Sequence, residues 1–117
     1  MVPVTTLYHL TERHDWAEAQ AAGSYQRSTR GVSLAEQGFI HCSLRHQVPG
    51  IADALYAGVA EVVLLVIDGD LVPAPIRYEA PEPGAEEYPH IYGPLPLDAV
   101  TAAIPLDRDA AGTLLLP

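Results

Sequence analysis

The chain has 117 residues, 49% of them hydrophobic, which suits one domain with a single core and leaves no room for two. Its 15 acidic residues against 6 basic ones give a formal net charge of −9, which repels phosphate backbones and anionic lipid. A large nucleic-acid partner or a membrane surface is therefore not expected, whereas a small anionic ligand in a local basic pocket stays compatible with this charge.

Cysteine usage and the N-terminus bear on the cellular compartment. Cys42 is the only cysteine, so no internal disulfide can form, which suits a reducing cytoplasm. The first residues lack the basic start and apolar run of a signal peptide, and the longest apolar run, Val62–Ile67, is too short to span a bilayer. We expect a cytoplasmic protein.

The first third of the chain predicts a strand followed by two helices. Leu7–Leu10 follows β-branched residues and is expected to be a strand. Thr11 is expected to be the N-cap of a helix that ends at Gly23. Ser33–Glu36 has the spacing of a capping box, and Gly38 ends this second, very short helix.

The middle of the chain predicts a strand, a helix and a second strand. Phe39–Ser43 is expected to be extended, and a helix is expected to start near Pro49. The buried face of that helix is predicted to carry Ile51, Ala54 and Leu55. Glu61–Asp68 is apolar on both faces, which predicts a strand at the centre of a sheet.

The last third predicts short strands separated by Pro- and Gly-rich segments. Ile76–Glu79 alternates like an edge strand, and the acidic loop Pro81–Glu87 is expected to be mobile at the mouth of a cleft. The remaining elements are extended structure over Tyr88–Gly93, a helical turn at Leu97–Val100, a strand at Thr101–Leu106 and a frayed tail over 107–117.

Helices cluster early and strands late, so the chain predicts one compact α+β domain over 1–117, with its core in about residues 4–106. The sheet is expected to be mixed or antiparallel rather than doubly wound and parallel. No Gly-rich phosphate loop follows a predicted strand, so the dinucleotide fingerprints are absent.

Three histidines, His9, His41 and His90, lie in predicted strands beside aromatic residues and hydroxyls. Alternation along a strand puts His41 on one face with Phe39 and Ser43, His90 with Tyr88 and Tyr92, and His9 with Leu7 and Thr11. Because imidazole exchanges a proton near neutral pH, the set predicts a polar cleft. The alternative is a structural role, since a single strand histidine is usually a buried hydrogen-bonding residue.

The sequence gives less support to a metal site or to a cysteine nucleophile. His9, His41, Cys42 and His90 are competent zinc ligands, but their spacing is not that of structural zinc sites, so no metal is predicted. Cys42 is expected to be a small buried residue rather than a nucleophile. Arg77 and Glu79 are the charged pair nearest the cleft and are expected to form a solvated strand face.

Two strings of the sequence are specific: Gly38–Ser43, which reads Gly-Phe-Ile-His-Cys-Ser, and His90–Leu95, which reads His-Ile-Tyr-Gly-Pro-Leu. Through these strings the chain resembles the family DUF952, a domain of unknown function found in bacteria and plants. The matching segments cover most of residues 7–105, and the resemblance implies no established activity.

The layout is also similar to the ADP-ribosyltransferase fold, including the His-x-Ser strand of RNA 2′-phosphotransferases. That resemblance implies an ADP-ribosyltransferase-like split sheet in which His9 holds a ribose hydroxyl of NAD and Ser43 or Tyr25 lies near the nicotinamide ribose. The glutamate common in that fold has no assigned counterpart here. Glu79 and His90 are the candidates.

These observations predict a cleft that binds, or performs transfer chemistry on, an ADP-ribose- or NAD-like small molecule, with NAD as a candidate substrate. The expected ligand-binding residues are His9, Thr11, Tyr25, Ser43 and Tyr92, and the expected catalytic residues are His90 and His41. A non-catalytic metabolite-binding module and a structural or interaction domain are the alternatives. The ligand's identity and the oligomeric state stay open.

Overall fold

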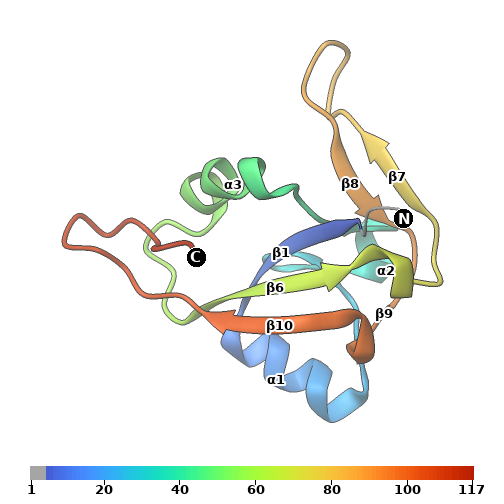
Figure 1. Cartoon of the computed structure of the whole chain (residues 1–117), viewed down its shortest axis with the longest axis horizontal. Helices are drawn as coiled ribbons and strands as arrows, with labels where there is room; N and C mark the ends of the chain where they lie inside the picture. The colour runs from blue at the N-terminus through green and yellow to red at the C-terminus, as the bar shows by residue number, and fades with distance from the viewer. Residues whose placement is uncertain (1–4) are drawn as a thin grey trace.

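The structure is a computed structural model that describes residues 5–117. Its three α-helices are α1 (Arg13–Ala22), α2 (Leu34–Gln37) and α3 (Val48–Leu55). Its strands are β1 (Thr6–Glu12), β2 (Ser24–Tyr25), β3 (Arg27–Thr29), β4 (Val32–Ser33), β5 (Ile40–His41), β6 (Val62–Asp68), β7 (Ile76–Glu79), β8 (Tyr88–Ile91), β9 (Leu95–Pro96) and β10 (Val100–Pro105). The chain is an α+β fold of several small antiparallel sheets, as predicted (Figure 1).

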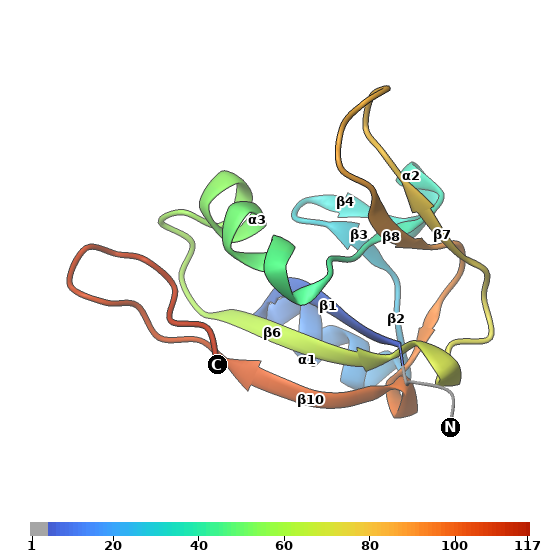
Figure 2. The same ribbon diagram turned by 45° about the horizontal axis from the view of Figure 1, so that its top comes forward.

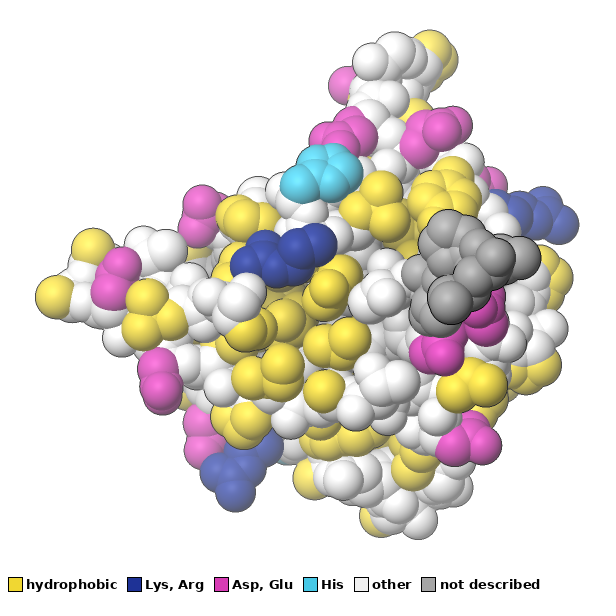
Figure 3. Space-filling view, in the orientation of Figure 1, with side chains coloured by type: hydrophobic (Ala, Val, Ile, Leu, Met, Phe, Trp, Pro, Cys, Tyr) yellow, Lys and Arg dark blue, Asp and Glu magenta, His cyan; other side chains and the backbone are white. Residues whose placement is uncertain are grey.

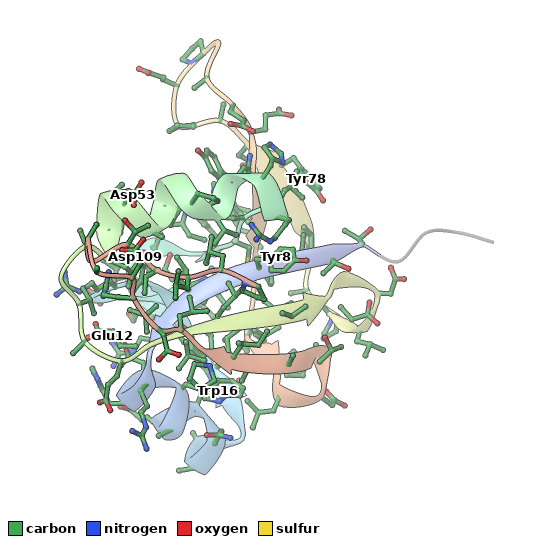
Figure 4. The ribbon with its side chains drawn as sticks, turned by 60° about the vertical axis from the view of Figure 1, so that its left-hand side comes forward. Tyr8, Glu12, Trp16, Asp53, Tyr78 and Asp109 are labelled. Carbon is green, nitrogen blue, oxygen red and sulfur yellow. The ribbon has the colours of Figure 1, made fainter. Side chains whose placement is uncertain are left out.

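The largest sheet has the order β1-β6-β10, with β6 between two antiparallel neighbours. Val62 to Leu65 are all buried, so both faces of β6 carry core, which confirms the predicted central strand. The two cores lie on opposite faces of this sheet: Figure 4 shows Tyr8 on the side of α3 and Trp16 on the side of α1. The helices α1 and α3 thus pack on opposite faces of this sheet.

A second sheet has the order β5-β8-β7, and its β7–β8 hairpin rises away from the first sheet (Figure 2). Ile40, Ile91 and Ile76 lie in register and pack toward the core. The two sheets meet where the backbones of Tyr8 and Ser43 exchange two hydrogen bonds, of 2.8 and 2.7 Å. β7 is an edge strand, as its alternating sequence predicts.

The start of α1 differs from the prediction. Thr11 is not a helix cap, because β1 continues through Glu12 in register with Val62 and keeps Thr11 in the strand. The helix starts at Arg13 without a side-chain cap, and Thr11 is buried. The predicted end is confirmed: Gly23 has φ 85° and donates its backbone N–H to Ala19.

The buried face of α3 also differs from the prediction. Val48 and Ala52 face the core, whereas Ala54 and Leu55 are exposed and Ile51 is half-buried. The helix packs on β1 and β6 through the side that carries Val48, Ala52 and the following Tyr56, so Ile51 and Leu55 lie on its other side.

The chain after Asp107, expected to be frayed, contacts the body of the protein. Leu114 is buried in the core beside α3, and the Arg108 guanidinium donates to the carbonyls of Tyr56 and Val59 at 2.6 and 2.7 Å. Within residues 5–117, no helix has the length and apolar character needed to cross a membrane.

The predicted capping box of α2 is confirmed. The Ser33 hydroxyl accepts the backbone N–H of Glu36 at 3.1 Å, and the Glu36 carboxylate accepts that of Ser33 at 3.0 Å. The hydrogen bond from the Ser33 backbone N–H, and then the Ser33 side chain, hold the pKa of the Glu36 carboxyl below its usual value.

We expect Ser33→Ala to lower the free energy of unfolding by about 1 kcal/mol, because the Glu36 backbone N–H in the first turn loses its acceptor. Urea denaturation of this variant beside Ser24→Ala, which removes a hydroxyl outside any cap, measures the effect. Equal stability of the two variants would contradict it.

Candidate functional site

A cleft of about 740 Å³ opens between α3 and the β5-β8-β7 sheet. Most of its wall is aromatic or aliphatic, and a few imidazoles, hydroxyls and one carboxylate converge in it. It is lined by His9, Leu10, Thr29, Gln37, Phe39, His41, Cys42, Ser43, Ile51, Leu55, Tyr56, Glu79, Ala80, Pro81, Tyr88, His90 and Tyr92. A concave, mostly apolar space with convergent polar groups is typical of a small-molecule site.

The strand register brings two of the three predicted histidines together. His41 on β5 is directly opposite His90 on β8, and their rings meet edge to face with centroids 4.7 Å apart. Phe39 stacks on His90 at 4.0 Å and also contacts His41 and Tyr92, at 4.8 and 5.3 Å. Alternation therefore places these rings on one face, as the sequence predicts.

Glu79 completes this cluster from the neighbouring strand. Its Oε1 atom accepts hydrogen bonds from the Tyr92 hydroxyl at 2.5 Å and from His90 Nδ1 at 2.8 Å. These two bonds lower the pKa of Glu79, and the bond to Glu79 raises the pKa of the Tyr92 hydroxyl. Because an ionised carboxylate only accepts, His90 is protonated at Nδ1.

The outward nitrogens of the histidine pair are free for a ligand. Among residues 5–117, no hydrogen-bond partner reaches His90 Nε2 or either ring nitrogen of His41. Burial, and then the neighbouring His90, lower the pKa of His41, so His41 is neutral at pH 7. The pair thus offers imidazole nitrogens to the cleft while Glu79 fixes the orientation of one ring.

His9 has a different environment from the other two. It is 4% exposed, and its Nδ1–H donates to the backbone carbonyl of His41, since a carbonyl can only accept. Its Nε2 is then the acceptor for the Tyr25 hydroxyl at 2.7 Å, and the Tyr25 oxygen lies 2.9 Å from the Thr11 hydroxyl. Both ring nitrogens are therefore used inside the protein, and burial lowers the pKa of His9 to about 4.

Tyr25 and Thr11 lie beneath the cleft rather than on its wall. They are 1% and 2% exposed and contact each other and His9. Desolvation raises the pKa of the Tyr25 hydroxyl, so it stays protonated. Of the five residues predicted to bind a ligand, the structure places His9, Ser43 and Tyr92 on the lining and these two behind it.

Cys42 and Ser43 form part of the cleft wall rather than reactive groups. Burial raises the pKa of the Cys42 thiol, which keeps it from being a thiolate nucleophile. Ser43 lines the cleft while its backbone joins the two sheets, so it is held in place by β1.

Two members of the cluster have more contacts than the sequence predicts. Phe39 shares a face with His41, as expected, and it also stacks on His90. Glu79, expected on a solvated strand face or as the counterpart of the fold's glutamate, contacts His90 through the β7–β8 register, which the sequence does not specify. Pro81, the first residue of the acidic loop, lines the cleft, as does Ala80 before it.

A group of side chains away from the cleft, within residues 5–117, could coordinate a metal ion. Glu12, His14 and Asp15 offer coordinating atoms within 4.8 Å of one another, which is close enough to share one ion. Asp15 already pairs with Arg27 at 3.5 Å, and Glu12 with Arg30 at 3.5 Å, so these carboxylates have cationic partners in the protein. On the face shown in Figure 3, the arginine side chains lie apart and form no patch.

Comparison with known proteins gives the family but no activity. The chain is similar to protein CC0527 from Caulobacter crescentus: one crystal structure shares 32% identity with a TM-score of 0.83, covering 96% of this chain and 95% of that one. The solution structure of CC0527 gives 31% identity and a TM-score of 0.76, covering 92% and 90%. No curated protein matches the sequence. A family model described as a protein of unknown function, DUF952, matches residues 10–103, and this chain belongs to that family.

Proposed function

We propose that the cleft binds a nucleotide-like small molecule of the ADP-ribose or NAD class, with a ring and its ribose inside the cleft. The observation that carries this proposal is the cluster of Phe39, His41, His90 and Tyr92, whose aromatic and imidazole groups open into one cavity. A cavity of about 740 Å³ is in the range for small ligands. Phe39 and Tyr92 offer stacking surface, and the imidazoles and Ser43 offer partners for ribose hydroxyls.

The split sheet supports the same proposal. Two antiparallel sheets, β1-β6-β10 and β5-β8-β7, are joined by the backbone pairing of Tyr8 with Ser43 and by the hydrogen bond from His9 to the His41 carbonyl, and the cleft lies beside this junction. This layout is compatible with the split sheet that the resemblance to the ADP-ribosyltransferase fold implies.

Transfer chemistry is the catalytic form of the proposal. The ribose carbon of NAD would form a bond to an acceptor oxygen as its bond to nicotinamide breaks, nicotinamide leaving with the bonding electrons. The acceptor's proton would pass to His90 Nε2, while Glu79 holds the opposite side of that ring. In this scheme Glu79 supports His90 rather than contacting the acceptor.

A binding module without turnover is the second candidate. Glu79 favours this second candidate. It is the only carboxylate that lines the cleft among residues 5–117, and its Oε1 already accepts hydrogen bonds from Tyr92 and His90. A carboxylate held in this way is well placed to orient a ring and poorly placed to take a proton from a substrate.

Thermal-shift measurements with NAD, ADP-ribose, adenosine and nicotinamide test the binding proposal, since a ligand of the native state raises its melting temperature. We expect at least one of these compounds to raise the melting temperature of the wild type and to lose most of that effect in Phe39→Ala. Tyr78→Ala is the matched control, because Tyr78 is an exposed β7 ring outside the cleft.

The proposal is wrong if none of the four compounds stabilises the wild type, or if Phe39→Ala and Tyr78→Ala respond alike. Chromatography of NAD incubated with the protein separates the two candidates. Release of nicotinamide that His90→Gln abolishes while binding persists indicates transfer chemistry, and binding without release indicates the module.

A further inference from the structure

The charge of the cleft restricts which ligand it can hold. Among the residues of 5–117 that line it, one is a carboxylate, Glu79, and none is Lys or Arg. The other polar groups are imidazoles, hydroxyls, a thiol and the Gln37 amide, which carry no fixed charge. The protein as a whole is also acidic, with a formal net charge of −9.

The ionisation of these groups keeps the cleft from becoming cationic at neutral pH. Hydrogen bonds from Tyr92 and His90 hold the pKa of Glu79 below its usual value, so this carboxylate is charged. Burial lowers the pKa of His41, so its ring does not supply a compensating positive charge. Arg77 is close enough for its charge to contribute to the lowered pKa of Glu79, but its side chain does not line the cleft.

The aromatic side chains that line the cleft also favour a cationic ligand. A ring face is electron-rich and attracts a cation within about 6 Å of its centre. The Arg77 guanidinium already makes such a contact, 5.0 Å from the centre of the Tyr92 ring. Phe39 and Tyr88 add further aromatic surface to the cleft without adding charge.

We infer that the ring bound in this cleft is a cationic heteroaromatic ring, such as an N-alkylated pyridinium, and that neutral and anionic rings of the same shape bind more weakly. This inference rests on the proposed function, whose ligand class includes neutral adenine as well as cationic rings. A diphosphate finds no Lys or Arg side chain along the lining, so the phosphates of a dinucleotide would lie outside the cleft.

Three probes of matched shape test the inference on the full chain: 1-methylnicotinamide, which is a cation, nicotinamide, which is neutral, and nicotinate, which is an anion. We expect calorimetry or NMR titration to give 1-methylnicotinamide an affinity at least about tenfold higher than nicotinate, with nicotinamide between them. Glu79→Gln should reduce this preference to less than about threefold, since the amide can still accept from Tyr92 and His90 but has no charge.

Glu82→Gln is the control, because Glu82 is an exposed carboxylate of the Pro81–Glu87 loop that does not line the cleft. It should keep the full preference of the wild type. Melting curves of both variants show that each is folded under the titration conditions.

Different failures separate the inference from the proposed function. If nicotinate binds as tightly as 1-methylnicotinamide, or if the preference survives in Glu79→Gln, the charge inference is wrong while the cleft remains a ring-binding site. If no probe binds the wild type but adenosine or ADP-ribose does, the inference is also wrong and the proposed function stands. If none of these compounds binds, both are wrong.

Discussion

Replacing His9 by alanine is expected to lower the free energy of unfolding by about 3 kcal/mol, without any ligand present. The imidazole is buried, so its removal leaves a cavity. It also leaves the Tyr25 hydroxyl and the His41 carbonyl without their partner. For a chain of this size, the melting temperature should fall by on the order of 10 °C.

His14→Ala is the matched control for this experiment, since the His14 side chain is 72% exposed and pairs only with Asp15 at 3.3 Å. Its melting temperature should stay within about 2 °C of the wild type, as for most surface changes. A stable His9→Ala variant that has lost its ligand-induced stabilisation would restore the ribose-binding role that the fold resemblance implies.

Acid should destabilise the protein through the same residue. Burial lowers the pKa of His9 to about 4 in the folded state, whereas an unfolded chain has its histidine near 6.5. Below pH 6.5 the unfolded state therefore binds a proton that the folded state does not, and stability falls as the pH falls from 6.5 toward 4. At pH 4.5 this linkage amounts to about 2.5 kcal/mol, and below pH 4 it increases little further.

The measurement compares urea denaturation of the wild type and of His9→Gln at pH 7 and pH 4.5. Glutamine can donate to the His41 carbonyl and accept from Tyr25 but cannot be protonated in this range. The stability difference between the two proteins should therefore shift by about 2.5 kcal/mol in favour of the variant at the lower pH. His41 and the carboxylates titrate in both proteins and cancel in this comparison; an unchanged difference would show that His9 is not buried as a neutral ring.

Local patterns in the sequence determined most of the element types. The apolar run at Val62–Ile67 predicts a central strand because only a strand covered on both faces can bury every side chain. The Ser33–Glu36 box and Gly23 mark helix ends because their chemistry acts within one turn of chain. Alternation likewise grouped Phe39 with His41 and Tyr88 with His90, since the period of a strand does not depend on its neighbours.

Register and docking were decided only by the tertiary structure. His41 and His90 are 49 residues apart in the sequence and become partners only because β5 pairs with β8 in one particular register. Thr11 has the hydroxyl of a helix cap, but the longer β1–β6 pairing holds it in the strand. On α3, the choice between the Ile51 stripe and the Val48 stripe depended on which side meets β1 and β6.

The three histidines show the same division between sequence and structure. The sequence by itself determined that each lies in a strand, with hydroxyl or aromatic side chains two positions away. It could not determine that His9 uses both ring nitrogens inside the protein, because its partners Tyr25 and His41 come from other strands. Nor could it show that Glu79 orients His90, because that contact requires the pairing of β7 with β8. Side-chain direction follows from local backbone geometry, whereas the partner of a side chain follows from contacts between distant segments, and those form only when the core is packed.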